Sequence, residues 1–237
     1  MANFQGIIRK SASNALTQFE KLGYHSQNFA NMNTTAYKGV SFEEVMTVEG
    51  YMKGCLRTNT AQGGIQRTQN PLDVAIDGAG YIPITSTEGN IYYTRDGHFT
   101  TDKEGYIKTL TGDMVGSGIQ IDPNSARIEI KNNGDVYTYK TKTSTPEYKG
   151  TIPLVTFNNP ESLKEVGGNK YITTEDSGEP ILEKDTKKIA QYGIERSNVD
   201  MFREVTDVLR VNAQMTAQTK LIQAIDSLYE KSIQIGS

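Results

Sequence analysis

Apolar side chains recur every three or four residues at both ends of this 237-residue chain, and that spacing predicts two amphipathic helices. The first helix is expected over residues 1–35. The polar run 31–35 should end it, because Asn and Thr side chains compete for backbone hydrogen bonds. Gln18 and Lys21 are expected on a solvated opposite face. The narrow apolar stripe consists of Phe4, Ile8, Ala12, Ala15, Phe19, Leu22, Ser26 and Phe29.

The second helix is expected over residues 197–237. Ser197 and Asn198 supply capping side chains at its start. Asp200 and Glu204 lie in the first turns, where the helix dipole favours acids. Its stripe has the same spacing and consists of Met201, Val205, Val208, Val211, Met215, Gln218, Ile222, Ile225 and Tyr229.

Neither stripe is strongly apolar, so both helices should be marginal in isolation and gain their stability by packing. A helical hairpin inside one globule is the simpler alternative, but the two stripes lie at opposite ends of the chain. The residues expected to make the assembly contacts are Phe4, Ile8, Phe19, Leu22, Phe29, Val205, Val208, Met215, Ile222, Ile225 and Tyr229.

Residues 70–196 change from a helical period to a period of two, which predicts a β-rich domain. Turn residues separate the runs, as is typical of an antiparallel barrel or sandwich. Residues 36–69 fit neither pattern and are expected to form an extended connector. The predicted class is α+β, with terminal helices paired as a coiled-coil-like stem. Strands are expected at 73–77, 80–85, 91–95, 106–110, 127–131, 135–139, 151–157 and 170–174.

Composition narrows the classes of partner. Hydrophobic residues make up 36% and charged residues 22% of the chain, which suits a folded protein more than a disordered one. The net charge of −3 argues against nucleic-acid binding, and no run of apolar residues is long enough for membrane insertion. Cys55 is the single cysteine, so it excludes an internal disulfide and is expected to fill a small apolar space. No cleavable secretory signal precedes the first helix, which suggests the cytosol unless a dedicated machine exports the chain.

The search for catalytic chemistry finds no convincing site. His25 and His98 are too few for a multi-His metal centre, and both are expected to be solvated. Residues 78–80 form a Gly-x-Gly that lacks the third glycine and the helix of a dinucleotide site. Asp73 and Asp77 are interpreted as solvated strand ends. The chain is therefore predicted to have no catalytic, cofactor-binding or metal-binding residues and not to be an enzyme.

Four ordered segments carry motifs of one known family. They are Asn28–Gly39, Asn70–Tyr81, Tyr93–Phe99 and Glu195–Val199, and they resemble motifs of flagellar basal-body rod and hook proteins. The segments reach both ends of the chain, which makes the resemblance specific. The motif residues are Asn28, Asn31, Thr35, Tyr37, Lys38, Pro71, Leu72, Asp73, Gly78, Gly80, Thr94, Arg95, Gly97, Ser197, Asn198 and Val199.

The resemblance implies a structural subunit of the rod, made in the cytoplasm and exported uncleaved by the flagellar type III apparatus. The terminal helices would line the axial tube of the basal body across the periplasm, with the β domain outside. Head-to-tail contacts that do not close give an open helical polymer, which can transmit torque from motor to hook. The implied partners are further copies of the chain, neighbouring rod and hook proteins and the export apparatus. The alternatives are a β-domain binding module that oligomerises through its helices, and an enzyme with an unrecognised site.

Two departures from the family pattern stand out. Ala36 replaces the glycine that usually precedes the aromatic residue, so a left-handed backbone is not expected there. Residues 213–216 replace the Arg-x-aromatic-Glu of the last helix. The short stretch from Gly39 to Asn70 favours a proximal rod protein or a short distal-rod homologue.

Overall fold

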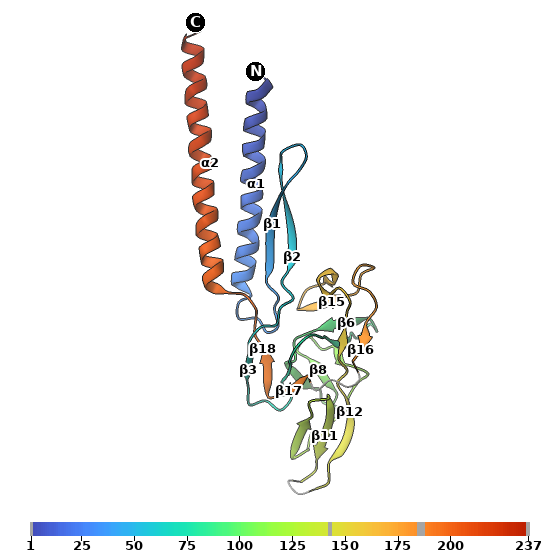
Figure 1. Cartoon of the computed structure of the whole chain (residues 1–237). Helices are drawn as coiled ribbons and strands as arrows, with labels where there is room; N and C mark the ends of the chain where they lie inside the picture. The colour runs from blue at the N-terminus through green and yellow to red at the C-terminus, as the bar shows by residue number, and fades with distance from the viewer. Residues whose placement is uncertain (1, 142–143, 184–187, 236–237) are drawn as a thin grey trace. The chain divides into compact units, whose positions relative to one another are not determined.

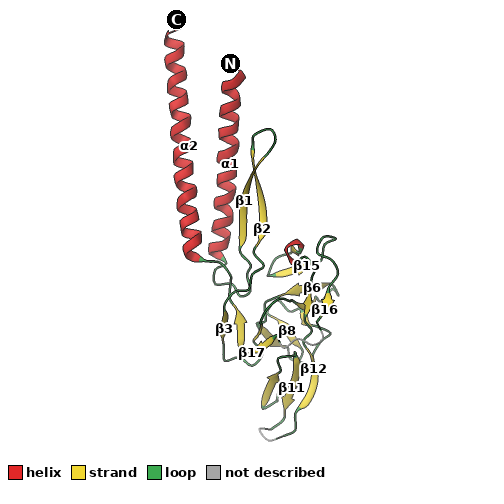
Figure 2. Cartoon of the chain, viewed as in Figure 1, coloured by secondary structure: helices red, strands yellow, loops and turns green. Residues whose placement is uncertain are grey.

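The computed structural model describes residues 2–141, 144–183 and 188–235, and they form two compact units. Unit 1 comprises Met1–Met32, Gly39–Asn59 and Val199–Ser237, and unit 2 comprises Asn33–Lys38 and Thr60–Asn198. The chain therefore crosses between the units four times. Figure 2 shows that the two long helices belong to unit 1 and that unit 2 is built mainly of strands.

Two helices lie side by side in unit 1 (Figure 1), α1 (Ala2–Ala30) and α2 (Met201–Ile235). Together with the strands they confirm the α+β class. Helix α2 begins later than predicted because Asp200 caps it. The Asp200 Oδ1 accepts hydrogen bonds from the Phe202 and Arg203 amides at 3.0 and 3.3 Å.

A β-hairpin occupies much of the expected connector. Strands β1 (Val40–Met46) and β2 (Met52–Thr58) pair antiparallel and pack along α1, as Figure 1 shows. The connector prediction is wrong here because one face of β1 is partly covered by the helix: Phe42 stacks on Tyr24, with ring centroids 5.6 Å apart. Gly50, at a φ of 79°, closes the turn.

The hairpin changes which side chains of α1 are buried. Gln18, predicted to be solvated, is 2% exposed, and Phe19 of the predicted packing stripe is 61% exposed. The cause is the polar face of the hairpin. The Glu44 carboxylate accepts hydrogen bonds from Gln18 Nε2 at 3.1 Å and Lys21 Nζ at 2.8 Å.

Unit 2 contains the β structure that the alternating pattern predicts. Strands occur in all eight expected runs. The sequence pattern missed the others, most of them only two or three residues long. The described strands of unit 2 are β3 (Ile65–Arg67), β4 (Val74–Ile76), β5 (Ile82–Thr85), β6 (Ile91–Thr94), β7 (Phe99–Thr101), β8 (Ile107–Thr109), β9 (Met114–Val115), β10 (Arg127–Ile130), β11 (Asp135–Tyr139), β12 (Glu147–Thr151), β13 (Val155–Thr156), β14 (Lys164–Glu165), β15 (Lys170–Ile172), β16 (Ile181–Leu182), β17 (Ile189–Gln191) and β18 (Gly193–Glu195). A short 3₁₀ helix, η1 (Pro160–Ser162), precedes β14.

The described strands pair antiparallel in several sheets. The largest has the order β14-β15-β6-β5-β9-β8-β7, and a three-stranded sheet has the order β10-β11-β12. Two short pairs join distant parts of the chain, since β17 pairs with β4 and β18 pairs with β3. These pairs hold the C-terminal end of unit 2 against its N-terminal strands.

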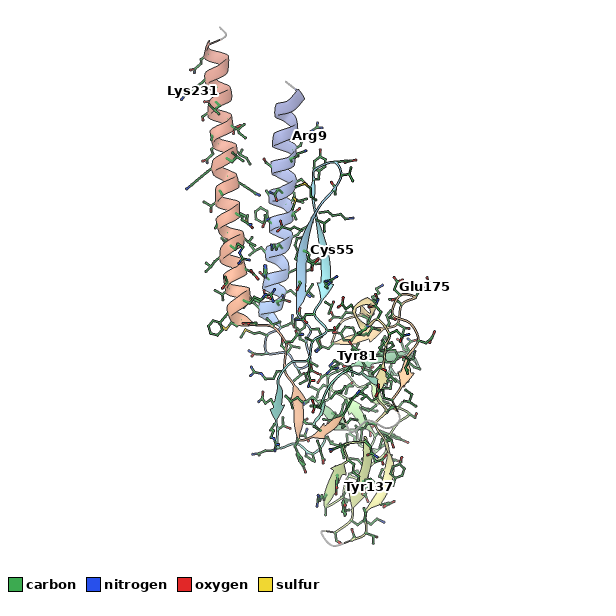
Figure 3. All side chains as sticks on the ribbon, in the orientation of Figure 1. Arg9, Cys55, Tyr81, Tyr137, Glu175 and Lys231 are labelled. Carbon is green, nitrogen blue, oxygen red and sulfur yellow. The ribbon has the colours of Figure 1, made fainter. Side chains whose placement is uncertain are left out.

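Two buried clusters form the core of unit 2. The larger is aliphatic, with Phe99 as its aromatic member, and consists of Leu72, Val74, Ile76, Ile82, Ile84, Phe99, Ile107, Val115, Ile119, Ile121, Ile130, Val136, Ile152, Leu154 and Ile189. The smaller is mostly aromatic and consists of Tyr81, Tyr93, Val155, Phe157, Leu163 and Tyr171. Figure 3 labels Tyr81 among the packed side chains of unit 2. The rings of this smaller cluster meet edge to face. The centroids of Tyr93 and Phe157, for example, lie 5.0 Å apart.

One glycine of the family motifs is required by a close approach of two backbones. The Gly97 carbonyl accepts a hydrogen bond from the Val74 amide at 3.0 Å. A Cβ placed on Gly97 would lie 1.8 Å from the Val74 carbonyl oxygen, which no side chain can tolerate without movement of the backbone.

Gly97→Ala is therefore expected to lower the free energy of unfolding of unit 2 by about 3 kcal/mol, the upper end of the range for overpacking. Urea denaturation followed by circular dichroism measures this loss. Gly64→Ala is the matched control, since a Cβ there meets nothing within 4 Å. Equal losses in the two variants would contradict the steric explanation.

The aromatic cluster predicts an alkaline limit of stability. Burial raises the pKa of Tyr171 far above its usual 10.0. The unfolded chain therefore loses this proton first, and stability that is complete below pH 10.0 is lost as the pH rises further. In this range the free energy of unfolding of the wild-type chain should fall by up to about 1.4 kcal/mol per pH unit, and Tyr171→Phe should remove that fall. Thermal melts from pH 8 to pH 12 measure it, with Tyr148→Phe, at a side chain 56% exposed, as the control.

Candidate functional site

A buried carboxylate at the end of β18 gathers three segments of unit 2. Glu195 is 1% exposed. Its Oε1 accepts hydrogen bonds from Lys38 Nζ at 2.7 Å and from the Gly63 amide at 2.8 Å, and its Oε2 accepts one from Arg95 Nε at 2.8 Å. Charge-assisted bonds of this kind are the strong ones in proteins.

Arg95 connects this carboxylate to the second family motif. Its Nη1 donates to the Gly80 carbonyl at 2.7 Å and its Nη2 donates to the Gly78 carbonyl at 3.0 Å. The guanidinium also lies 5.9 Å from the centroid of the Tyr81 ring. Glu195 and Arg95 therefore hold together residues from all four motifs, which the sequence showed only as separate segments.

Lys38 completes the cluster. Its Nζ also donates to the Ala61 carbonyl at 2.7 Å, and the residue is 2% exposed. Burial lowers the pKa of Lys38 below its ordinary 10.5, and the hydrogen bond to Glu195 opposes that shift. When Lys38 and Arg95 are both charged, two cations face the single carboxylate of Glu195. Glu195 is therefore the residue whose charge the cluster cannot lose without leaving both cations unpaired.

Backbone bonds reinforce the same place. The Ala36 amide donates to the Glu195 carbonyl at 2.8 Å, and the Asn198 amide donates to the Tyr37 carbonyl at 3.3 Å. The Asn198 side chain donates to the Ala61 carbonyl at 2.8 Å. We call residues Lys38, Arg95 and Glu195, with the segments 33–38, 60–64 and 193–198 that they join, the Glu195 clamp.

Ala36 corrects an expectation from the sequence. It adopts a φ of 56°, the left-handed region that was not expected without the family's glycine. A non-glycine residue costs about 1–2 kcal/mol there. Two hydrogen bonds hold Ala36 in this conformation. One runs from the Ala36 amide to the Glu195 carbonyl and the other from the Tyr37 amide to the Thr34 carbonyl.

Asp73 is also not solvated as predicted, whereas the side chain of His98 is 38% exposed. Asp73 is 1% exposed, and its Oδ1 accepts a hydrogen bond from Asn70 Nδ2 at 2.8 Å and lies 3.2 Å from His98 Nδ1. Burial raises the pKa of the neighbouring Asp96 above its ordinary value. Asp77 is exposed, as expected.

A second polar cluster lies in unit 1. Asn28 of the first motif binds the backbone of Val40 through both polar atoms, at 2.9 Å each, and donates to Glu204 Oε1 at 2.8 Å. His25 Nδ1 lies 2.5 Å from Glu204 Oε2, so the prediction of a solvated His25 is wrong. We call His25, Asn28, Val40 and Glu204 the Glu204 clamp. It joins α1, β1 and α2.

The predicted assembly residues whose side chains are described divide into an exposed and a half-buried group. The structure leaves Phe19 61% and Val205 39% exposed. The side chains of Phe4, Ile8 and Tyr229 lie outside the described ones. The half-buried members are Leu22, Phe29, Val208, Met215, Ile222 and Ile225.

Unit 1 leaves much of its apolar surface uncovered. Among its described residues, Val211 is the one apolar side chain that is fully buried. Val48, at the tip of the hairpin, is completely exposed, and Cys55 of β2, labelled in Figure 3, is exposed instead of filling an apolar space. The exposed apolar residues of unit 1 are Leu16, Phe19, Val45, Met46, Val48, Leu56, Met201, Phe202, Val205, Leu209, Leu221 and Leu228.

The remaining motif residues support the core of unit 2 or the ends of its segments. Leu72 lies in the aliphatic core. The Pro71 carbonyl accepts a hydrogen bond from Gln191 Nε2 at 2.7 Å. Thr94 Oγ1 donates to the Asn169 carbonyl at 2.9 Å, and Asn169 Nδ2 donates to the Thr35 carbonyl at 2.6 Å.

Among the remaining motif residues, Ser197 lies in segment 193–198 of the Glu195 clamp, and three important residues were not predicted as site residues. Asn31 donates to the Gln27 carbonyl within unit 1. Ser197 and Val199 flank Asn198, at the last crossing between the units. Glu195, Asn169 and Gln191 were missed. For Glu195, its place inside the last motif was the available signal.

The described part of the chain contains no group of three or more His, Cys, Asp or Glu side chains placed to hold a metal ion. Neither described helix is long and apolar enough to cross a membrane.

Known proteins resemble the chain over most of its length. Residues 75–138 match the family model of the flagellar hook protein FlgE/F/G D1 domain. The flagellar basal-body rod protein FlgG of Caulobacter vibrioides is 30% identical, over 97% of the chain and 99% of the relative. FlgG of Buchnera aphidicola subsp. Acyrthosiphon pisum is 28% identical, over 89% and 92%. The rod protein FlgF of Mesorhizobium japonicum is 27% identical, over 97% of both chains.

The charge balance of the Glu195 clamp predicts unequal costs for its members. Glu195→Gln leaves two buried cations without an anion and is expected to cost about 3–5 kcal/mol of stability. Lys38→Met keeps the Arg95–Glu195 pair and should cost only about 1–3 kcal/mol, for the lost hydrogen bonds to Glu195 and Ala61. Glu129→Gln, at a partly exposed pair with Arg127, is the control and should cost about 1 kcal/mol or less. Urea titration of the purified chains measures all three, and a Lys38→Met cost equal to that of Glu195→Gln would rule out this charge argument.

Proposed function

The chain belongs to the family of flagellar basal-body rod proteins, and we propose that it polymerises through its terminal helices into the axial helical tube of the rod. It is a structural subunit of the rod in the flagellar basal body. Its relatives are rod proteins and not enzymes, which supports a role without catalysis. The polymer transmits torque from motor to hook.

The observation that carries this proposal is the reversed burial in unit 1. Helix α1 buries Gln18, His25 and Asn28 and leaves Phe19 and Leu16 exposed. Helix α2 leaves Phe202 84% exposed. Exposed apolar surface of this extent marks an interaction site. Neighbouring copies of the chain would cover it in a head-to-tail polymer whose contacts do not close.

The helices are proposed to pair as a coiled-coil-like stem. The half-buried Val208, Met215 and Ile222 of α2 recur every seven residues. The buried Val211 and the half-buried Gln218 and Ile225 each lie three residues further on, which gives the three-four spacing of a helix–helix seam. Full burial of a large apolar side chain contributes about 1.5–3 kcal/mol. Ordering the backbone costs about 1–2 kcal/mol per residue, so the ends of the helices gain their full stability only on docking.

The same weakness suits export. We propose that the flagellar type III apparatus carries the chain uncleaved, with the helices ordering afterwards. Residues 1–35 and 197–237 then act as the stem and residues 70–196 as the outer domain. The hairpin places much of the connector 36–69 with the stem helices. Other rod and hook proteins are the proposed neighbours, and a proximal or short distal position stays a prediction.

Leu209→Glu tests the polymer. Leu209 is 64% exposed on α2, so the charge should leave the fold of the free chain unchanged and prevent docking against a neighbour. Cells that carry the variant are expected to form no complete hook-basal body, as seen by electron microscopy of isolated basal bodies.

Leu110→Glu is the control, because Leu110 is 67% exposed in unit 2 and undergoes the same change. Normal basal bodies with Leu209→Glu would contradict the proposed interface. A purified chain of one fixed oligomeric mass would favour the binding-module alternative. Sedimentation equilibrium distinguishes that case.

A further inference from the structure

At three of the four crossings between the units, hydrogen bonds hold the chain on both sides of the crossing. At the second crossing, Lys38 belongs to the Glu195 clamp and Val40 to the Glu204 clamp, so Gly39 alone lies between them. Glycine is the residue with the widest range of backbone conformations. This link is therefore one residue long and flexible only in its backbone dihedrals.

The other two crossings are equally short. At the third, the Asn59 amide donates to the Gly39 carbonyl at 2.8 Å, and the Ala61 carbonyl accepts Lys38 Nζ. Thr60 alone lies between these bonds. At the fourth, Asn198 is bound to Ala61 and Asp200 caps α2, so one residue, Val199, separates the two.

We propose that the Glu195 clamp is the element that carries torque across these crossings, because it ties the unit 2 ends of three separate chain segments to one another. A single peptide segment rotates about its φ and ψ bonds and resists twist poorly. Three short segments tied together at one end cannot rotate independently, so twist applied to one is shared by all. The inference rests on the torque-transmitting role proposed above.

The bonds that make this tie lie across the segments and not along them. Lys38 Nζ joins segment 33–38 to segments 60–64 and 193–198 through Ala61 and Glu195. The amides of Ala36 and Asn198 join the first segment to the third. Loss of Lys38 therefore weakens the tie between the segments, whose other bonds remain, while the Arg95–Glu195 pair still holds β18 to the rest of unit 2.

Lys38→Met in the full chain removes bonds between the three segments and should leave the rest of unit 2 folded. Hydrogen exchange of the purified variant should rise together at four amides that bond across the segments, those of Ala36, Gly63, Arg196 and Asn198. The expected rise is at least about tenfold, the effect of losing one hydrogen bond to a charged group. The amides of Tyr81, Ile107 and Ile152, bonded elsewhere in unit 2, should keep their protection and serve as internal controls. Unchanged exchange at the four amides overturns the proposal.

The second measurement is rotation under load. Cells with Lys38→Met are expected to build basal bodies but to lose rotation of tethered filaments as medium viscosity rises, whereas cells with Glu129→Gln keep it. Wild-type rotation at every viscosity overturns the proposal even if exchange has increased. A variant that builds no rods is judged by the exchange result alone. The polymerisation proposal is tested separately, because it would be contradicted by normal basal bodies with Leu209→Glu.

Discussion

The fold of unit 2 depends on one buried carboxylate opposite two cations. Glu195 is held by Lys38, by Arg95 and by the Gly63 amide, all within 2.8 Å. Buried ion pairs add little net stability compared with apolar packing, but the loss of one partner is costly. Such a cluster specifies an arrangement more than it stabilises one. Here it specifies how segments 33–38, 60–64 and 193–198 meet.

Unit 1 follows a different principle. Four polar residues of α1 contact the carboxylates of Glu44 and Glu204, and many of the unit's large apolar side chains are exposed. Within a single chain this arrangement fixes alignment and leaves the apolar surface for other molecules. Polar groups buried at helix contacts are known to set register at the expense of stability. The two units therefore separate two tasks, one stable by its own core and one completed by its neighbours.

The sequence predicted the helices, the eight strand runs and the family because these depend on local periodicity and on short motifs. It did not predict β17 and β18, which are short and pair with strands β4 and β3, more than 100 residues earlier. The orientation of α1 was wrong because the partners of Gln18 and Lys21 lie on a hairpin that the Gly- and Thr-rich connector concealed. The motifs named most members of the Glu195 clamp, but no local pattern shows that side chains 157 and 100 residues apart share one carboxylate.

These long separations give the chain an order of folding. Synthesis proceeds from the N-terminus, so Lys38 and Arg95 emerge well before the residue that neutralises them. Closing such a long loop costs entropy before any contact compensates for it, which delays the pairing of β17 and β18 further. A chain that stops before β17 would lack Glu195 as well, and would keep two cations facing an apolar interior and an unpaired β4 edge. The β core is thus completed only when β17 and β18 have emerged, and a subunit truncated before them is marked by its failure to close.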